Sequence, residues 1–388
     1  MSAWKKVFSD SINLLEAKYD DLRFDLKRKL GLNDPVQIIP YRSYGTVNRL
    51  YLKGRVLEDK KIAASGDKDT ILNNLVNMYK RFESDEVPNA VLKVDFQDQT
   101  HQLVTDDEGY YMINLEPTFP IETTDIWHTL EIELENAPIP FIPGLKAVSE
   151  VLVPPSDAEY GIISDIDDTI VETSATNVLA MSRTVFLHNA RTRLPFAGVS
   201  AFYKSLQLGR NGKRNNPFFY VSSSPWNMYD LLKEFMDLNE IPAGPLLLRD
   251  FGLQENKFFS SGGHMGHKFK EIENILLTYP TLNFVLIGDS GQEDPSIYRE
   301  VVKQYPGRIL AIYIRDVQLL EREQIALKIK EELSKDKVDM LILDNAEEAA
   351  EHAASIGLIF EEAIPEIATE KEQDKGQAPG KEEAKIIE

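Results

Sequence analysis

The stretch GIISDIDDTI, residues 161–170 of this 388-residue chain, decides the fold. An apolar run leads into the carboxylates of Asp165, Asp167 and Asp168, and apolar residues resume directly after Thr169. Carboxylates this close repel one another unless a hard cation lies among them, and Mg²⁺ prefers such oxygen ligands. Ligands of open α/β sheets bind beyond the carboxyl ends of the strands. We therefore expect a buried strand that presents Asp165 and Asp167 to a magnesium ion; a solvated acidic turn is the alternative.

Hydroxyl side chains follow a second apolar run, residues 218–221. Ser222, Ser223 and Ser224 come next, and the pair Ser224-Pro225 is typical of a helix N-cap with proline at the first helical position. Hydroxyls and free amides at a helix start bind anions. The segment is therefore a candidate phosphate site, and the alternative is that its serines only cap and turn the chain.

A glycine-rich segment, residues 262–267, leads into a helix that begins with Lys268. A lysine in the first helical turn opposes the helix dipole, so its position needs another reason. Neutralising a phosphoryl oxygen or a catalytic carboxylate would be such a reason, whereas an exposed surface lysine is the alternative. Spacing alone does not choose between Lys268 and Lys270.

A third apolar run, residues 284–287, leads into GDSGQEDP, residues 288–295. Gly288 stands where the backbone must turn tightly, and Asp289 and Asp294 could ligate the cation directly or through water. Simple loop acids are the alternative. Because parallel strands end along one edge of their sheet, we expect the groups after all these strand ends to converge there.

Residues 156–355 are predicted to form an α/β domain, because strand-like and helix-like stretches alternate from Glu159 onward. This order implies a parallel sheet with helices on both faces. The expected strands are 160–164, 217–221, 245–248, 283–287 and 309–314, with an apolar run at 338–343, and the expected helices include 226–238, 268–277, 317–335 and 345–355.

The rest of the chain has a different pattern. Residues 1–32 are predicted to form an amphipathic helix, and residues 361–388 are acidic and expected to be disordered. Residues 36–155 are predicted to form a small β-sandwich with a helical insertion at 69–81. Its expected strands are 49–57, 90–96, 110–115 and 128–134.

Composition excludes several classes of function. The net charge of −20 argues against nucleic-acid binding. The chain has no cysteine, which excludes disulfides and thiolate metal sites. No apolar stretch has the length of a membrane span, so a cytoplasmic protein is expected. Residues 1–32 hold seven basic and five acidic side chains, a net charge of +2. This charge leaves open a peripheral contact with an anionic membrane.

The segments DIDDT, SSSPWN, HK and GDSGQEDP together resemble the actin patch phosphatidate phosphatase family. The catalytic domain of that family belongs to the haloacid dehalogenase superfamily and has motifs like those of the lipins. The resemblance runs from about Pro40 to Arg315 and includes GRVLED at 54–59 and SDEVP at 84–88. It implies a haloacid dehalogenase-like Rossmannoid fold and a magnesium-dependent phosphatase.

The resemblance also implies roles for individual residues. Asp165 corresponds to the nucleophile and Asp167 to the general acid and base, while Lys268 is favoured over Lys270 by the spacing of the helix that follows. Binding of the phosphoryl group would fall to Ser222, Ser223 and Thr169, and binding of Mg²⁺ to Asp165, Asp167, Asp289 and Asp294.

The expected reaction is hydrolysis of a phosphomonoester through an aspartyl-phosphate on Asp165. Phosphatidate, which would give diacylglycerol and phosphate, is the first expected substrate. Another soluble or protein-borne phosphomonoester is the second. A non-catalytic scaffold is the third interpretation, and the complete set of acids argues against it.

Overall fold

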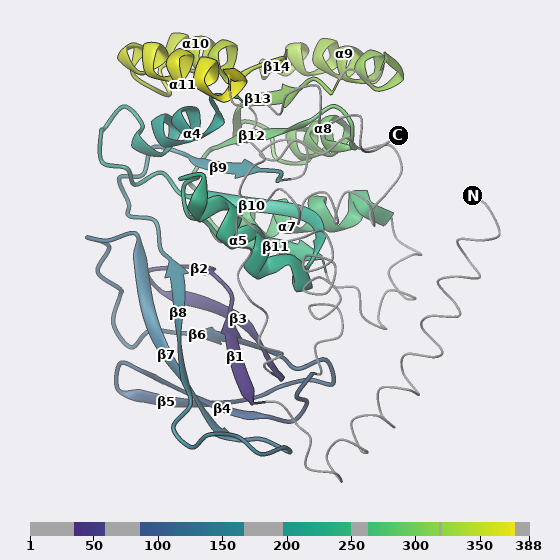
Figure 1. The fold of residues 1–388 in the computed structure, drawn as a ribbon. Coiled ribbons are helices and arrows are strands. Elements are labelled where there is room, and N and C mark those ends of the chain that lie inside the picture. The colour runs from purple at the N-terminus through teal and green to yellow at the C-terminus, as the bar shows by residue number, and fades with distance from the viewer. Residues whose placement is uncertain (1–34, 59–85, 167–196, 250–262, 318–319, 377–388) are drawn as a thin grey trace, which may run out of the picture.

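The computed structural model describes residues 35–58, 86–166, 197–249, 263–317 and 320–376 (Figure 1). The predicted helices at 1–32 and 69–81 lie outside these residues. Two sheets form the framework, one in a β domain and one in an α/β domain. None of the helices in the described ranges has the length and apolar character that crossing a bilayer requires.

The α/β domain is built on six parallel strands in the order β11-β10-β9-β12-β13-β14. The chain starts in the middle at β9, moves outward on one side, and then returns to the other side of β9. Ligands of such sheets bind where this reversal occurs. The strands are β9 (Gly161–Ser164), β10 (Phe218–Pro225), β11 (Leu246–Arg249), β12 (Phe284–Asp289), β13 (Ile309–Arg315) and β14 (Asp339–Leu343).

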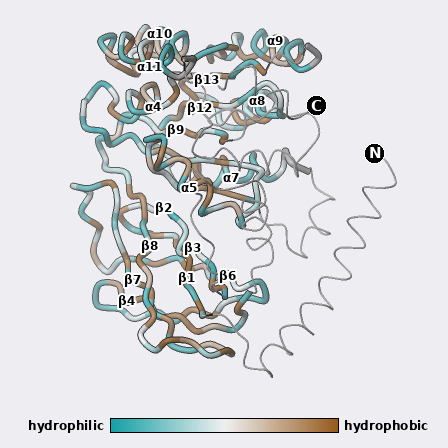
Figure 2. Tube along the Cα trace, in the orientation of Figure 1, coloured by the Kyte–Doolittle hydropathy of each residue, from teal (hydrophilic) through white to brown (hydrophobic). Residues whose placement is uncertain are grey.

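Helices cover both faces of this sheet, as the sequence predicted (Figure 1). Successive strand residues alternate between the two faces, so Ile162 packs with one helical layer and Ile163 with the other. One layer contains α4 (Val199–Leu208), α5 (Tyr229–Leu238), α10 (Ala346–Ser355) and α11 (Ile364–Gly376); the other contains α7 (Gly263–Thr278), α8 (Asp294–Gln304) and α9 (Leu320–Lys335). In Figure 2 the outer helices α9, α10 and α11 mix hydrophilic and hydrophobic residues, which fits their one-sided burial.

The β domain contains eight strands joined in one sheet, where the sequence predicted a sandwich. The two halves of this sheet are connected by a short parallel pairing of β2 and β8, which comprises Ser43 with Val151 and Tyr44 with Leu152. Without that pairing the strands would divide into two antiparallel sheets around one apolar core. The strands are β1 (Val36–Pro40), β2 (Ser43–Thr46), β3 (Arg49–Glu58), β4 (Val91–Phe96), β5 (Gln99–Val104), β6 (Tyr110–Leu115), β7 (Trp127–Asn136) and β8 (Lys146–Leu152).

Four strands of this sheet, β1, β2, β5 and β8, were not predicted from the sequence. The strands β1 and β2 are short and contain Pro40 and Gly45, two residue types that are uncommon in strands. Strand β5 is mostly polar and lies at the edge of the sheet. Pairing with neighbouring strands therefore determines these strands, because their own sequences have no strong strand pattern.

Aromatic side chains join the two domains. Tyr41 stacks on Trp226 with ring centroids 4.3 Å apart, and Tyr44 meets Phe219 edge to face at 5.7 Å. The Tyr279 hydroxyl donates a hydrogen bond of 2.9 Å to the backbone carbonyl oxygen of Gly45. The β2–β3 region is therefore packed directly against the α/β domain.

The region from residue 361, which was expected to be disordered, is helical as far as residue 376. A short 3-10 helix, η2 (Glu361–Ala363), leads into α11, where Ile367 is completely buried. Lys371 pairs with Glu347 of α10. The acidic composition suggested disorder, but Ile367 of α11 is buried in the same apolar cluster as the alanines of α10. Residues 377–388 lie outside the described ranges.

Replacing Ile367 by alanine should lower the free energy of unfolding by about 2–5 kcal/mol, because a fully buried isoleucine leaves a cavity. Urea denaturation followed by circular dichroism measures this change. Ile325 of α9 is 46% exposed, so Ile325→Ala is the control and should change stability by less than about 0.5 kcal/mol. Equal, small effects of both substitutions would show that α11 contributes nothing to the folded domain.

Candidate active site

Two neighbouring strands deliver the first two carboxylates. Asp165 follows β9 directly, and Asp289 is the last residue of β12. These strands pair in parallel with Ser164 opposite Ile287, and the Asp165 amide donates a hydrogen bond of 2.9 Å to the Ile287 carbonyl oxygen. Both side chains are at most 1% exposed. The register thus places two carboxylates side by side at the carboxyl edge of the sheet.

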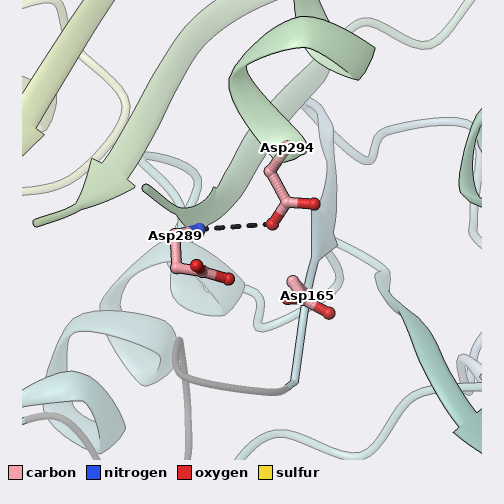
Figure 3. Close-up of side chains that lie close together, drawn as sticks. All are labelled: Asp165, Asp289 and Asp294. Carbon is pink, nitrogen blue, oxygen red and sulfur yellow. Dashed lines mark hydrogen bonds between the residues drawn. The ribbon is translucent and has the colours of Figure 1, made fainter. Parts of the chain in front are cut away.

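Asp294 is the third carboxylate and the first residue of α8. It is fully buried, and carboxylate oxygens of Asp165, Asp289 and Asp294 all lie within 4.8 Å of one another. Figure 3 shows the three side chains around a common space. The Asp289 amide donates a hydrogen bond of 3.2 Å to Asp294 Oδ2, the dashed line in Figure 3. The predicted convergence of Asp165, Asp289 and Asp294 is therefore present.

Gly288 makes room for this arrangement. A Cβ atom at this position would lie 2.4 Å from Asp294 Oδ2 and 2.9 Å from the Tyr298 hydroxyl oxygen. That hydroxyl donates a 2.8 Å hydrogen bond to the Ile287 carbonyl oxygen and so has little freedom to move. The glycine is needed for the close approach of Asp294 to β12, whereas the sequence analysis assigned it to a tight turn.

Lys268 is the cation of the cluster. Its Nζ lies 3.0 Å from Asp165 Oδ2 and 2.7 Å from Asp294 Oδ1, and its side chain is 4% exposed. Burial opposes the charged form, but the charges of Asp165, Asp294 and Asp289 outweigh it and raise the pKa of Lys268. Lys270, the alternative from the sequence, is exposed. The geometry therefore places Lys268 in the site.

Gln292 is a member of the cluster that the sequence analysis did not single out. Its side-chain amide donates to Asp165 Oδ2 at 3.3 Å and accepts from Lys268 Nζ at the same distance. Its backbone amide donates to Asp289 Oδ1 at 2.9 Å. A glutamine between a glycine and a glutamate carries no distinctive signal, and only its location inside the segment 288–295 could have indicated a role.

Ser222 lies near the end of β10, on the strand next to β9. Tyr220 is opposite Ser164, so Ser222 is level with Ile166 at the same edge of the sheet. The buried Ser222 Oγ accepts a hydrogen bond of 2.9 Å from the Ser224 amide and so orders the turn, while Ser223 is half-buried. The predicted N-cap at Ser224 is wrong, because Pro225 precedes the 3-10 helix η1 (Trp226–Met228) and no side chain caps it.

The β domain contacts the turn after these serines. Arg55 of β3 donates from Nη1 to Asn227 Oδ1 at 3.1 Å, and its other nitrogens bond Glu86 Oε1 at 2.8 Å and the Glu108 carbonyl oxygen at 2.7 Å. Arg55 itself is 4% exposed. The candidate site is thus supported by a residue from the other domain, within the segment GRVLED on which the family resemblance partly rests.

The remaining predicted site residues, Asp167 and Thr169, lie outside the described ranges. Among the described residues the cluster offers only carboxylate oxygens to a metal, which fits a hard cation such as Mg²⁺ or Ca²⁺ rather than Zn²⁺. Among the described residues, Lys268 is the cation that pairs with this cluster, so three ionised carboxylates would exceed its charge. A divalent cation would remove that excess.

Residues 160–316 match the family model described as the catalytic domain of phosphatidate phosphatase APP1. Phosphatidate phosphatase APP1 of Saccharomyces cerevisiae is 33% identical over 261 residues, which cover 64% of this chain and 41% of the yeast protein. The family resemblance found from the motifs is thereby confirmed.

Two further similarities carry less information. Uncharacterized protein C29B5.04c of Schizosaccharomyces pombe is 31% identical over 159 residues, covering 40% of this chain and 25% of that protein. The chain therefore spans less than half the length of both curated relatives. A carbohydrate acetylesterase from Xanthomonas citri aligns over 82% of this chain and 75% of its own with 10% identity, but its TM-score of 0.28 supports no argument.

Replacing Lys268 by methionine should lower the free energy of unfolding by about 3 kcal/mol in the presence of a chelator, because it leaves buried carboxylates without their cation. Added Mg²⁺ should recover part of the loss. The matched control is Lys270→Met in the same helix, expected to change stability by less than about 0.5 kcal/mol. Urea denaturation with and without Mg²⁺ measures both, and similar stabilities of the two variants would contradict the assignment of Lys268 to the cluster.

Proposed function

Residues 160–316 belong to the family of phosphatidate phosphatase APP1 catalytic domains, and on this basis we propose that the protein is a magnesium-dependent phosphatidate phosphatase. The observation that carries the proposal is the buried group of Asp165, Asp289, Asp294 and Lys268 at the reversal point of the parallel sheet. The strand order and the acid directly after the first strand support a haloacid dehalogenase type of Rossmannoid domain.

The donor set suits Mg²⁺, and we assign Asp165 and Asp289 as its direct protein ligands, together with Asp167. Both oxygens of Asp294 already accept hydrogen bonds, from Lys268 and from the Asp289 amide. Asp294 therefore fits better as the residue that holds Lys268 and Asp289 in place, reaching the ion through water. A bound Mg²⁺ would neutralise negative charge on the phosphoryl oxygens.

Asp165 is the proposed nucleophile. One of its oxygens attacks phosphorus, the bond from phosphorus to the alkoxide oxygen breaks, and an aspartyl-phosphate forms. Gln292 and Lys268 both contact Asp165 Oδ2, so they fix the direction of the carboxylate. Lys268 lies close enough to Asp165 to pair with the phosphoryl group once it is attached.

Asp167 is the proposed general acid and base. It gives a proton to the departing alkoxide, which leaves as the alcohol, and then takes a proton from the water that attacks phosphorus. The second attack breaks the bond between Asp165 and phosphorus and releases inorganic phosphate. Ser222 and Ser223, at the same edge of the sheet, and Thr169 are proposed to bind the phosphoryl oxygens.

Another phosphomonoester is the second candidate substrate, favoured by the net charge of −20, which opposes approach to an anionic bilayer. A panel of phosphatidate vesicles, sugar phosphates, nucleotides and phosphopeptides separates the two candidates. Phosphatidate should give the highest kcat/KM. A soluble phosphomonoester that exceeds it would replace phosphatidate as the substrate and leave the phosphatase assignment intact.

Asp165→Asn should reduce magnesium-dependent hydrolysis of both p-nitrophenyl phosphate and phosphatidate by at least about a thousandfold, because the amide is a poor nucleophile. The control is Asp339→Asn, an exposed acid at the start of β14 and away from the site. Phosphate release measures both variants. If the wild-type protein hydrolysed none of the phosphomonoesters in the presence of Mg²⁺, the phosphatase proposal would be wrong and the non-catalytic scaffold interpretation would be favoured.

Asp167→Asn should accumulate phosphorylated protein when p-nitrophenyl phosphate is the substrate. The nitrophenolate leaves without much help from an acid, whereas hydrolysis of the aspartyl-phosphate needs the base. Rapid acid quenching followed by intact-mass measurement detects the added phosphate. Fast turnover without accumulation would exclude Asp167 as the base.

A further inference from the structure

A groove of about 590 Å³ lies between the two domains. On the β domain it is lined by residues of β2, β3 and β6, and on the α/β domain by residues of β11 and α7. Figure 1 shows α7 and β11 on the side of the α/β domain that faces the β domain. Its size falls in the range of about 300–1,000 Å³ that is usual for ligand sites, which often lie at domain interfaces.

The groove has apolar and aromatic walls and an apolar rim. Tyr51 and Trp226 contribute to the walls, while Met112 of β6 and Leu277 of α7 line the outer part. Met112 is 62% exposed and Leu277 is 63% exposed, and the Tyr51 hydroxyl donates to Met112 Sδ at 3.2 Å. Apolar side chains exposed around a groove favour an apolar ligand, because they lose contact with water when it binds.

Arg49 adds a positive charge to this outer part. It is exposed, and its Nε donates to Asn114 Oδ1 at 3.0 Å. In the part of the chain that the structure describes, no carboxylate forms an ion pair with Arg49, whereas Arg42, further along the groove, is paired with Glu150 at 3.1 Å and Asp237 at 3.4 Å. Arg49 is therefore placed to meet an anion outside the protein.

The helix α7 links the groove to the candidate active site. Glu271 lines the groove one helical turn after Lys268 on α7. Lys53 also lines it, with Nζ 4.3 Å from the centre of the Trp226 ring. Burial and the positive charges of Arg249, Lys268 and Lys53 lower the pKa of His267 to about 4. Arg249 and Lys53 thus add positive charge near His267 and Lys268, and this charge would favour the approach of a phosphate toward Asp165.

We propose that this groove binds the glycerol and acyl part of a phosphatidate molecule whose phosphate reaches Asp165, and that Arg49 contacts anionic headgroups around it. The inference rests on the proposed function. An apolar rim with a cation beside it matches an anionic amphiphile. A phosphopeptide would gain little from Met112 and Leu277, and a sugar phosphate would gain less. The local cation also offsets the unfavourable net charge of the protein near an anionic surface.

Vesicle sedimentation tests binding without turnover if all proteins carry Asp165→Asn. Leu277→Glu and Met112→Glu, each added separately, should weaken binding to phosphatidylcholine vesicles that contain phosphatidate by at least about tenfold, because a charge replaces an apolar contact. The control is Ile142→Glu, which changes an equally exposed residue (66%) outside the groove. It should bind like the parent. Equal binding by all variants, or equal weakening by the control, would overturn the proposal.

The ratio of kcat/KM for phosphatidate vesicles to that for p-nitrophenyl phosphate provides the second readout, in proteins with Asp165 intact. This ratio should fall in Leu277→Glu, Met112→Glu and Arg49→Glu, and it should keep the wild-type value in Ile142→Glu. An unchanged ratio in the groove variants overturns the lipid groove while the phosphatase stands. If the groove variants lost kcat/KM only for phosphopeptides, the groove would be assigned to a peptide instead. If the wild-type protein were inactive on both phosphatidate and p-nitrophenyl phosphate, the proposed function itself would be overturned.

Discussion

Three carboxylates share a space from which the protein excludes water, and the rest of the α/β domain is arranged so that they can remain there. Each acid alone would be costly to bury in its ionised form. Lys268 compensates part of the charge at 3.0 Å from Asp165 and 2.7 Å from Asp294. Backbone amides and Gln292 supply further hydrogen bonds. The carboxylate oxygens that face one another could hold a metal ion, and on the proposed function this ion would in turn bind a phosphate.

The same constraint explains several features away from the acids. β9 and β12 must be neighbours, which is a property of the strand order and not of either strand. Gly288 must lack a side chain so that Asp294 can approach. The helix α7 begins at Gly263, five residues before the predicted start at Lys268, so Lys268 lies in its second turn, and its later turns line the groove against the β domain. The proposed chemistry and the proposed lipid contact therefore involve the same helix.

Much of the fold could be predicted from the sequence where the local signal was strong. The strands β9, β10, β12 and β13 each contain an apolar run, which burial on both faces of a parallel sheet favours. The polar edge strand β5 and the helix α11 have weak local patterns and were missed, because their stability comes from what they pack against. The short pairing of β2 with β8 joins two predicted sheets into one and has no sequence signal at all.

Asp165 and Asp289 were recognisable in the linear sequence because each directly follows or ends an apolar run, and Asp294 was recognisable because it lies five residues after Asp289. The sequence also indicated the phosphatase family, because the four motifs follow one another in the family's order. The family resemblance favoured Lys268 over Lys270, and the tertiary structure then placed Lys268 in the cluster. That Gln292 bridges members of the cluster and that Arg55 of the β domain supports the serine turn could be learned from the tertiary structure alone. Such contacts depend on distances between segments far apart in the chain, and these distances are set by packing rather than by local preference.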